Sequence, residues 1–373
     1  MVQLKLSEDS STADNSSAAK KMDRYNSLVT FAPFVAGDIN PLVPIEDIPW
    51  LDESLIKHGF TFYATHFNQS MFAIILVFVL GLPVKSVTSV VLKGQMGDPK
   101  NYFSRYLSTL KLNCEFLWFY FDKKKAYKTY EYVRKQHNFA RNFYTKPSTK
   151  PIQPKDDANL FVEKWKEEIS TAVSADLNHI DTSSAPQHLL TWKPPLAVSQ
   201  LDMALVQFMF IWMFWGFPKL FGIKNRVEEL KGIIHLWAIH GRMIGIQDEY
   251  NICLNPDPEF YDLLTRNFLI ESLKNMDETV ITVKSTLMGA LGARIPFMTY
   301  KALMYISLRE LQEREGESLW RIMSFRDKLS YRFLQGWMWI ARQNLVLRFL
   351  LDIPVGLWTL YQFRSHAFTE IKK

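Results

Sequence analysis

The residues best suited to chemistry lie in two short runs, RYLST beginning at Arg105 and RKQHNFAR beginning at Arg134. If the first run is helical, Arg105 and Thr109 share one helix face, because residues four apart lie one turn apart. If the second run is helical, Arg134, His137 and Arg141 share a face in the same way. A histidine between two arginines could ligate a haem iron while the guanidinium groups meet the haem propionates. The spacing alone does not establish such a site.

Four motifs, taken in chain order, resemble those of a known family. They are the RxxxT pair of Arg105 and Thr109, the VRxxH run ending at His137, LDMALVQFMF at residues 201–210 and HLWAIHGRMIGIQDEYN at residues 235–251. Together they resemble the catalytic domain of ER-bound oxygenases and rubber oxygenases (latex clearing proteins), and most of all its animal members. The likeness covers residues 50–253, and a helical tail of the kind found in that family follows.

The resemblance implies a fold, a cofactor and a reaction. The fold is an all-α, globin-like helical bundle around a haem pocket, and the cofactor is haem b. The reaction is oxygenation of a hydrophobic unsaturated substrate, an isoprenoid or another lipid, by O2 activated at a histidine-ligated iron. The implied partners are therefore haem, O2 and an apolar small molecule.

The resemblance also assigns roles to single residues. His137 is the axial ligand of the haem iron, and Arg134 and Arg141 bind the haem beside it. Arg105 and Thr109 are the catalytic pair at the polar edge of the pocket, where Arg105 also contacts the cofactor. Two departures from the family concern the reaction. Ser108 stands where some members carry a lysine that caps the distal iron position, and residues 75–100 hold a single acid, Asp98, so no general base is assigned.

Each of these residues also has a purely structural interpretation. A helical histidine such as His137 is often a hydrogen-bonded core residue, and Arg134 and Arg141 are compatible with a solvated, lysine-rich helix face. Thr109 in mid-helix can bond back to a backbone carbonyl.

The second pair of motifs favours packing over chemistry. His235 and Glu249 lie fourteen residues apart, which fits no common zinc pattern. Asp202 and Gln207 are expected to start a helix and to add one polar group to it. The aromatic and methionine residues of the same helix can line a pocket, but at helical spacing they are more often core: Phe208, Met209, Trp212 and Met213.

Composition narrows the class of protein. Of 373 residues 48% are hydrophobic, but the mean hydropathy of −0.09 is too low for a polytopic membrane protein. Two cysteines, Cys114 and Cys253, without a CxxC pair favour a reducing compartment. The N-terminus shows no signal peptide, so we expect an intracellular protein, with endoplasmic-reticulum membrane association left open.

The net charge of +6 comes largely from residues 123–146. A basic run beside aromatic residues can bind nucleic acid or an anionic membrane, or simply be a solvated helix face. No nucleic-acid-binding signature accompanies it, so nucleic acid is not expected as a partner, whereas peripheral membrane contact stays open.

The pattern of caps, prolines and apolar runs predicts one helical domain. Residues 1–45 are expected to form a disordered leader and residues 46–373 the helical domain, with surface connectors at 146–158 and 181–198. The apolar stretches at 71–82 and 203–217 are predicted to be buried helices, since each falls short of the ~20 residues needed to span a bilayer.

Two readings of the function other than an oxygenase remain open at this point. One is a haem-binding carrier or sensor without turnover. The other is a membrane-associated helical protein that keeps the scaffold but binds no haem, which the apolar stretches would favour.

Overall fold

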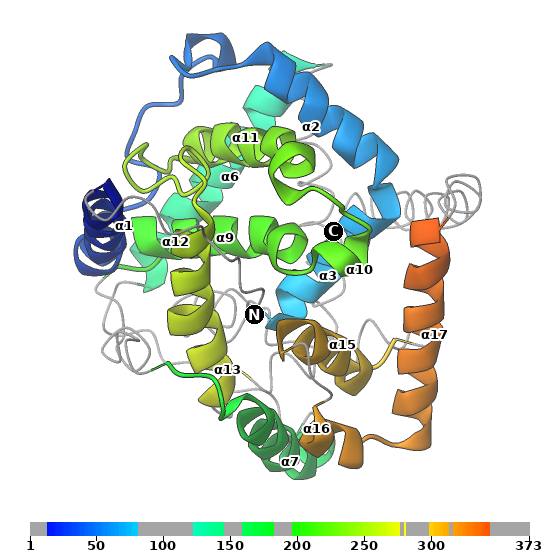
Figure 1. The fold of residues 1–373 in the computed structure, drawn as a ribbon. Helices are drawn as coiled ribbons and strands as arrows, with labels where there is room; N and C mark the ends of the chain where they lie inside the picture. Colours follow the sequence, from blue (N-terminus) through cyan, green and yellow to red (C-terminus); the bar gives the residue numbers. More distant parts are fainter. Residues whose placement is uncertain are drawn as a thin grey trace, which may run out of the picture.

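The structure is a computed structural model, and it describes residues 13–80, 122–144, 159–182, 196–276, 280, 298–312 and 316–343. Within these ranges every regular element is helical, and the one pairing of extended backbone is an isolated bridge between Ala36 and Ser199 (Figure 1). The predicted all-α class is confirmed.

The longer helices are α1 (Ala13–Thr30), α2 (Glu53–Thr65), α3 (Phe67–Leu80), α6 (Lys123–Tyr144), α7 (Asn159–Leu177), α9 (Gln200–Gly216), α11 (Arg226–Ile244), α15 (Tyr300–Gln312) and α17 (Phe325–Gln343). Between them lie α10 (Pro218–Phe221) and α16 (Glu317–Arg321), and the 3-10 turns Ala32–Phe34 and Ile45–Asp47. Helix α12 (Pro258–Leu264) continues through a π-helical segment, Thr265–Ile270, into α13 (Glu271–Lys274).

Helix α9 lies in the middle of the bundle (Figure 1). Ser199 and Asp202 form a reciprocal capping box at its start, which satisfies backbone N–H groups that have no partner inside the helix. The helix ends at Gly216, because Pro218 cannot continue it. Nearly all its side chains are buried, Val206 being an exception. The prediction of a central core helix is therefore confirmed.

Helices α2 and α11 pack closely because glycine faces glycine where they cross. A Cβ atom on Gly232 of α11 would lie 2.3 Å from the backbone nitrogen of Gly59 in α2, so a larger residue cannot fit there. A Cβ atom on Gly241 would likewise meet the Gln207 side chain of α9, at 2.3 Å. At both positions the missing side chain lets a neighbouring helix come close to α11.

Helix α3 is the predicted apolar helix of residues 71–82, and its described side chains are largely buried in the main core. Among the described helices, none taken alone is long and apolar enough to cross a bilayer. Residues 53–65 and 69–80 pass that test as a pair, on length and composition only, across a bend of 89°.

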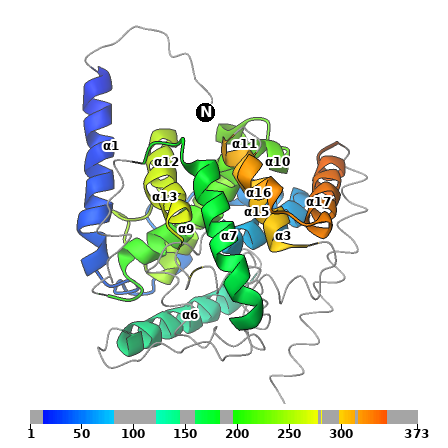
Figure 2. The same cartoon turned by 90° about the horizontal axis from the view of Figure 1, so that it is seen from below.

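The prediction of a disordered leader through residue 45 is wrong for the part that the structure describes. Helix α1 stands at one edge of the molecule (Figure 2), and Tyr25 and Leu28 are buried in the main core. Arg24 donates to the carbonyl oxygens of Asn251 and Asn255 and stacks on the Phe260 ring. The polar composition of the segment hid these few anchoring residues.

The main hydrophobic core draws residues from α1, α3, α7, α9, α11, α12, α13, α15 and α17, so these elements share one interior. A second, smaller cluster joins α2, α6 and α11. The connector predicted at residues 146–158 lies outside the described residues. Of the connector at 181–198, only residues 181–182 and 196–198 are described.

Candidate functional site

Helix α6 presents His137 to the interior. The Asp122 carboxylate accepts a hydrogen bond from the Lys125 backbone N–H and caps the helix. Ala126 and Tyr130 are buried in the cluster shared with α11. His137 lies seven residues after Tyr130, two turns along the same face, so its ring points toward α11.

The His137 side chain is half-buried and its imidazole is uncharged. Its Nδ1 atom is buried and has no hydrogen-bond partner in the described part of the chain. Burial, and after it the positive charges of Arg141 and Arg134, lower the pKa of His137 to about 4. The neutral imidazole is the form that binds a metal ion. A buried polar atom without a partner is uncommon and calls for a functional or structural explanation.

His240 of α11 lies within electrostatic range of His137. Its Nδ1 atom is 3.4 Å from the Tyr130 hydroxyl, and its ring makes an edge contact with Trp237 at 5.0 Å between centroids. Burial lowers the pKa of His240 to about 3, and His137 contributes to the shift. Two half-buried, neutral imidazoles, one on α6 and one on α11, therefore lie within electrostatic range of each other.

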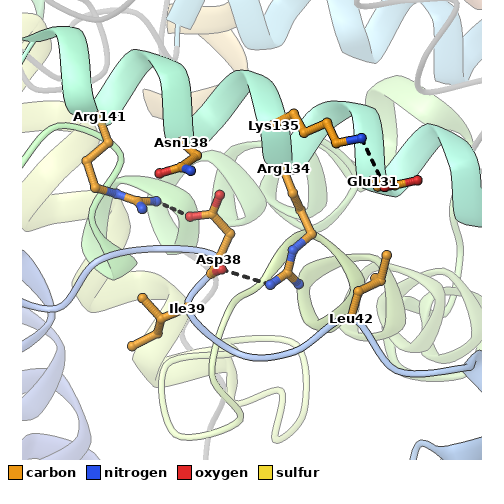
Figure 3. A pocket seen from close by; sticks show the side chains of 8 residues that line it. All are labelled: Asp38, Ile39, Leu42, Glu131, Arg134, Lys135, Asn138 and Arg141. Atoms are coloured by element: carbon orange, nitrogen blue, oxygen red, sulfur yellow. Dashed lines mark hydrogen bonds and ion pairs between the residues drawn. The ribbon is translucent and has the colours of Figure 1, made fainter.

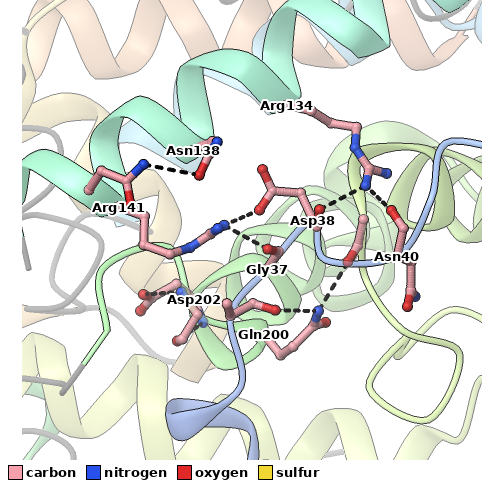
Figure 4. A network of polar contacts seen from close by, with 12 residues as sticks. Gly37, Asp38, Asn40, Arg134, Asn138, Arg141, Gln200 and Asp202 are labelled. Atoms are coloured by element: carbon pink, nitrogen blue, oxygen red, sulfur yellow. Dashed lines mark hydrogen bonds and ion pairs between the residues drawn. The ribbon is translucent and has the colours of Figure 1, made fainter.

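Arg134 ties α6 to the loop at residues 37–40 (Figure 4). Its guanidinium group donates to the carbonyl oxygen of Asp38 at 2.8 Å, to that of Met243 at 3.3 Å, and to that of Asn40. A planar group with several fixed donors suits such a set of carbonyl oxygens.

Arg141 holds the same loop one turn past His137. It donates to the Gly37 carbonyl oxygen at 2.6 Å and forms an ion pair with the Asp38 carboxylate. The pair is largely buried, with side-chain exposures of 13% for Arg141 and 3% for Asp38. Burial raises the pKa of the Asp38 carboxyl, while Arg141 and Arg134 act in the opposite direction. The Arg141 Nε atom is buried without a partner.

The loop meets α9 and α11 at a junction of left-handed backbone. Asp38, Val198 and Gly245 have φ of 49°, 56° and 103°. The Asp38 N–H donates to the Gly245 carbonyl at 3.1 Å, and the Gly37 N–H donates to that of Val198 at 3.0 Å. A β-branched residue with positive φ costs about 1–3 kcal/mol, so Val198 is held there by its surroundings.

An open groove of about 400 Å³ runs between this loop and α6 (Figure 3). His137 is not among the side chains that line it. Its lining side chains are Asp38, Ile39, Leu42, Glu131, Arg134, Lys135, Asn138 and Arg141.

The structure places the predicted site residues in two groups. Arg134, His137 and Arg141 share one side of α6, as their spacing predicts, and both guanidinium groups contact the 37–40 loop. Arg105 and Thr109 lie outside the described residues, so their role stays a prediction.

The second pair of motifs takes structural positions. His235 accepts a hydrogen bond from the Asp52 backbone at 3.1 Å, and burial lowers its pKa. Gln207 donates to the Trp237 carbonyl oxygen at 2.7 Å and to the Asn251 side chain at 3.0 Å. The four aromatic and methionine residues of α9 named above are all buried in the main core.

Sequence reasoning missed Asp38 and the pairing of His240 with His137. Asp38 follows Gly37, and a Gly-Asp dipeptide is a turn signal compatible with positive φ. No local pattern, however, connects it to arginines about a hundred residues further along the chain. His240 stood in a recognised motif, but nothing in its spacing indicated which helix it faces.

Within the described ranges, no three histidine, cysteine, aspartate or glutamate side chains come together to hold a metal ion. The described residues thus offer the buried Nδ1 atom of His137 as one nitrogen donor, with the His240 imidazole and the guanidinium groups of Arg134 and Arg141 nearby.

No protein-family model, curated protein or solved structure matches this chain.

Proposed function

We propose that this chain is a b-type haem protein of globin-like helical architecture in which His137 is the axial iron ligand. We propose further that it is an oxygenase acting on an apolar, unsaturated isoprenoid or other lipid. The observation that carries the proposal is the uncharged His137 ring, whose Nδ1 atom is buried and has no partner among the described residues.

The chemistry of His137 fits an axial ligand. A metal needs the lone pair of a neutral imidazole, and a pKa of about 4 keeps the ring unprotonated at neutral pH. Arg134 and Arg141 support this state, since a proton on the ring would add a third positive charge beside theirs. Haem, when bound, supplies the O2 chemistry that amino-acid side chains lack.

The two arginines have a second role in this proposal. Both bind the 37–40 loop. The Asp38 carboxylate forms an ion pair with Arg141, and a haem propionate would bind a guanidinium group in the same way. Propionate binding at Arg141 would therefore share the guanidinium group with Asp38, for which the unpartnered Nε–H of Arg141 is one remaining donor. Arg105 and Thr109 complete the proposed site as the catalytic pair.

The test of haem ligation is reconstitution of the full chain with haemin and titration of the Soret band. We expect parent protein to give the band, His137→Ala to lose it, and added imidazole to restore it in His137→Gly. His235→Ala is the matched control, because that histidine also lies on a helix and is partly buried but already accepts a hydrogen bond. An unchanged band in His137→Ala would overturn the ligand assignment.

Oxygen uptake tests the second half of the proposal. The reconstituted protein is expected to consume O2 in the presence of a polyene lipid, and His137→Ala is expected not to. A stable haem complex without O2 consumption would instead identify a haem carrier or sensor.

A further inference from the structure

One face of helix α6 carries a stripe of lysine and aromatic side chains. Its residues follow one another at intervals of three or four, so they lie along one side of the helix: Lys124, Lys128, Tyr132, Lys135 and Phe139. All five are exposed, Tyr132 to 54% and Phe139 to 64%. The Phe139 ring stacks on that of Phe143 at 5.8 Å between centroids, and most of Phe139 nevertheless faces solvent.

The opposite side of α6 holds the helix to the protein. Ala126 and Tyr130 are buried in the cluster shared with α11, and Arg134 and Arg141 bind the 37–40 loop. Figure 2 shows α6 along one edge of the molecule. The helix has 22 residues and is therefore about 33 Å long, so its exposed stripe suits an extended, flat partner.

The charge of this stripe is positive. Lys124 and Lys128 form no ion pair with a described acidic residue, and the same holds for Lys125 at the edge of the stripe. Lys135 pairs with Glu131 at 3.0 Å, and Glu131 is the one acid in the α6 sequence. The stripe is therefore complementary to a surface of negative charge.

We propose that this face of α6 binds an anionic lipid bilayer, with the helix lying in the plane of the membrane surface. Tyr132 and Phe139 would enter the boundary between headgroups and acyl chains, where aromatic side chains are favoured. The lysines would contact the anionic headgroups, and their long apolar stems suit that position.

A nucleic acid and a second copy of the chain fit this face less well. Arginine is the residue that binds phosphate in a bidentate way, and both arginines of α6 bind the 37–40 loop instead. Lysines act as point charges, which suits a surface of mobile headgroups. A two-fold contact between copies would bring two lysine-rich stripes together without enough acid to neutralise them.

Flotation of the full chain with lipid vesicles tests the proposal, and it requires neither haem nor catalysis. The vesicles contain phosphatidylcholine alone, or phosphatidylcholine with about 30 mol% phosphatidylserine. We expect the parent protein to float with the anionic vesicles, and to float less when the salt concentration is raised from about 0.1 M to about 0.5 M.

Two double variants of the stripe separate charge from apolar contact. Lys124→Gln combined with Lys128→Gln should weaken binding to anionic vesicles about twenty-five-fold, since each lysine near the surface contributes about fivefold. Tyr132→Ser combined with Phe139→Ser should weaken binding about tenfold, because it removes apolar contact with the bilayer.

Matched controls lie on helix α17. Arg326→Gln combined with Arg332→Gln removes the same charge from exposed positions there, and Phe325→Ser removes an exposed aromatic side chain. Both controls should float like the parent, because the net charge and the exposed aromatic area change without any change in α6.

Three results would overturn the proposal. The first is a parent protein that stays in the soluble fraction with anionic vesicles; binding of single-stranded RNA in that case would assign the face to nucleic acid. The second is unchanged flotation of both α6 double variants. The third is an equal loss of flotation in the α6 variants and the α17 controls, which would show that overall charge rather than this face determines binding.

Discussion

Asp38 is the residue on which the geometry beside His137 depends most. Its carboxylate balances Arg141, its carbonyl oxygen accepts from Arg134, and its backbone adopts a conformation that few residues other than glycine, asparagine and aspartate tolerate. Burial first, and then the charges of both arginines, lower the pKa of His137 and keep its ring unprotonated. One side chain thus links the loop, the charges and the proposed ligand.

Asp38→Asn removes the charge while keeping a residue that accepts positive φ. We expect the free energy of unfolding in urea to fall by about 3–5 kcal/mol, because Arg141 is left as a buried cation without its partner. Glu131→Gln is the control, since its ion pair with Lys135 is solvent-exposed and should contribute at most about 0.5 kcal/mol. Equal stability of the two variants would show that the charge of Asp38 does not contribute to the free energy of unfolding.

At the level of helices and turns, the glycines are of two kinds. Some lie where a Cβ atom would collide with neighbouring atoms, and others lie where a Cβ atom would meet open space. Gly245 ends α11 with a φ of 103°, and a Cβ atom there would lie 2.1 Å from the Asp38 Cα atom. Gly336 lies inside α17, and a Cβ atom there would meet nothing within 4 Å. The two positions therefore predict opposite effects of the same substitution.

Gly245→Ala should lower the free energy of unfolding by at least about 2 kcal/mol, because the backbone is strained and the junction with the loop must open. Gly336→Ala should raise it by about 0.5–1 kcal/mol, the difference in helix propensity. Thermal unfolding followed by far-UV circular dichroism measures both. A stable Gly245→Ala protein would mean that the junction is not required for the fold.

Helix starts were predictable because capping is local chemistry. Asp52, Asp122 and Ser199 each accept a backbone N–H from the residue three positions ahead, and aspartate and serine are residue types that commonly cap helices in this way. The shared face of Arg134, His137 and Arg141 was predictable for the same reason, since it needs only helical spacing. The partners of that face were not predictable, because Gly37, Asp38 and Asn40 lie about a hundred residues away and are joined to it by tertiary packing alone.

At the scale of the whole molecule, the N-terminal segment belongs to the folded body. Leu28 is buried in the main core, although helix α1 as a whole is largely polar. Polar composition predicts disorder only when too few apolar side chains are present to offset the loss of chain entropy. Here a few well-placed apolar residues on α1 offset that loss. Arg24 adds hydrogen bonds to the Asn251 and Asn255 carbonyl oxygens and a contact with the Phe260 ring.

Leu28→Ala is expected to lower the free energy of unfolding by about 2–5 kcal/mol, the usual cost of deleting a buried leucine side chain. Met22→Ala in the same helix is the control, because Met22 is exposed and its loss should change stability by about 0.5 kcal/mol or less. Urea denaturation followed by tryptophan fluorescence measures both. Equal free energies of unfolding for the two variants would show that α1 does not pack against the rest of the protein.

The left-handed junction joins segments that are synthesised at different times. Residues 37–40 leave the ribosome long before Val198 and Gly245, so the nascent loop has neither of its backbone partners while α6 is being made. During that interval Arg134 and Arg141 remain hydrated, and the His137 ring has no wall of α11 behind it. These contacts are therefore complete only after translation has passed residue 245, and a truncated product ending earlier would carry His137 without the surroundings that keep its ring neutral.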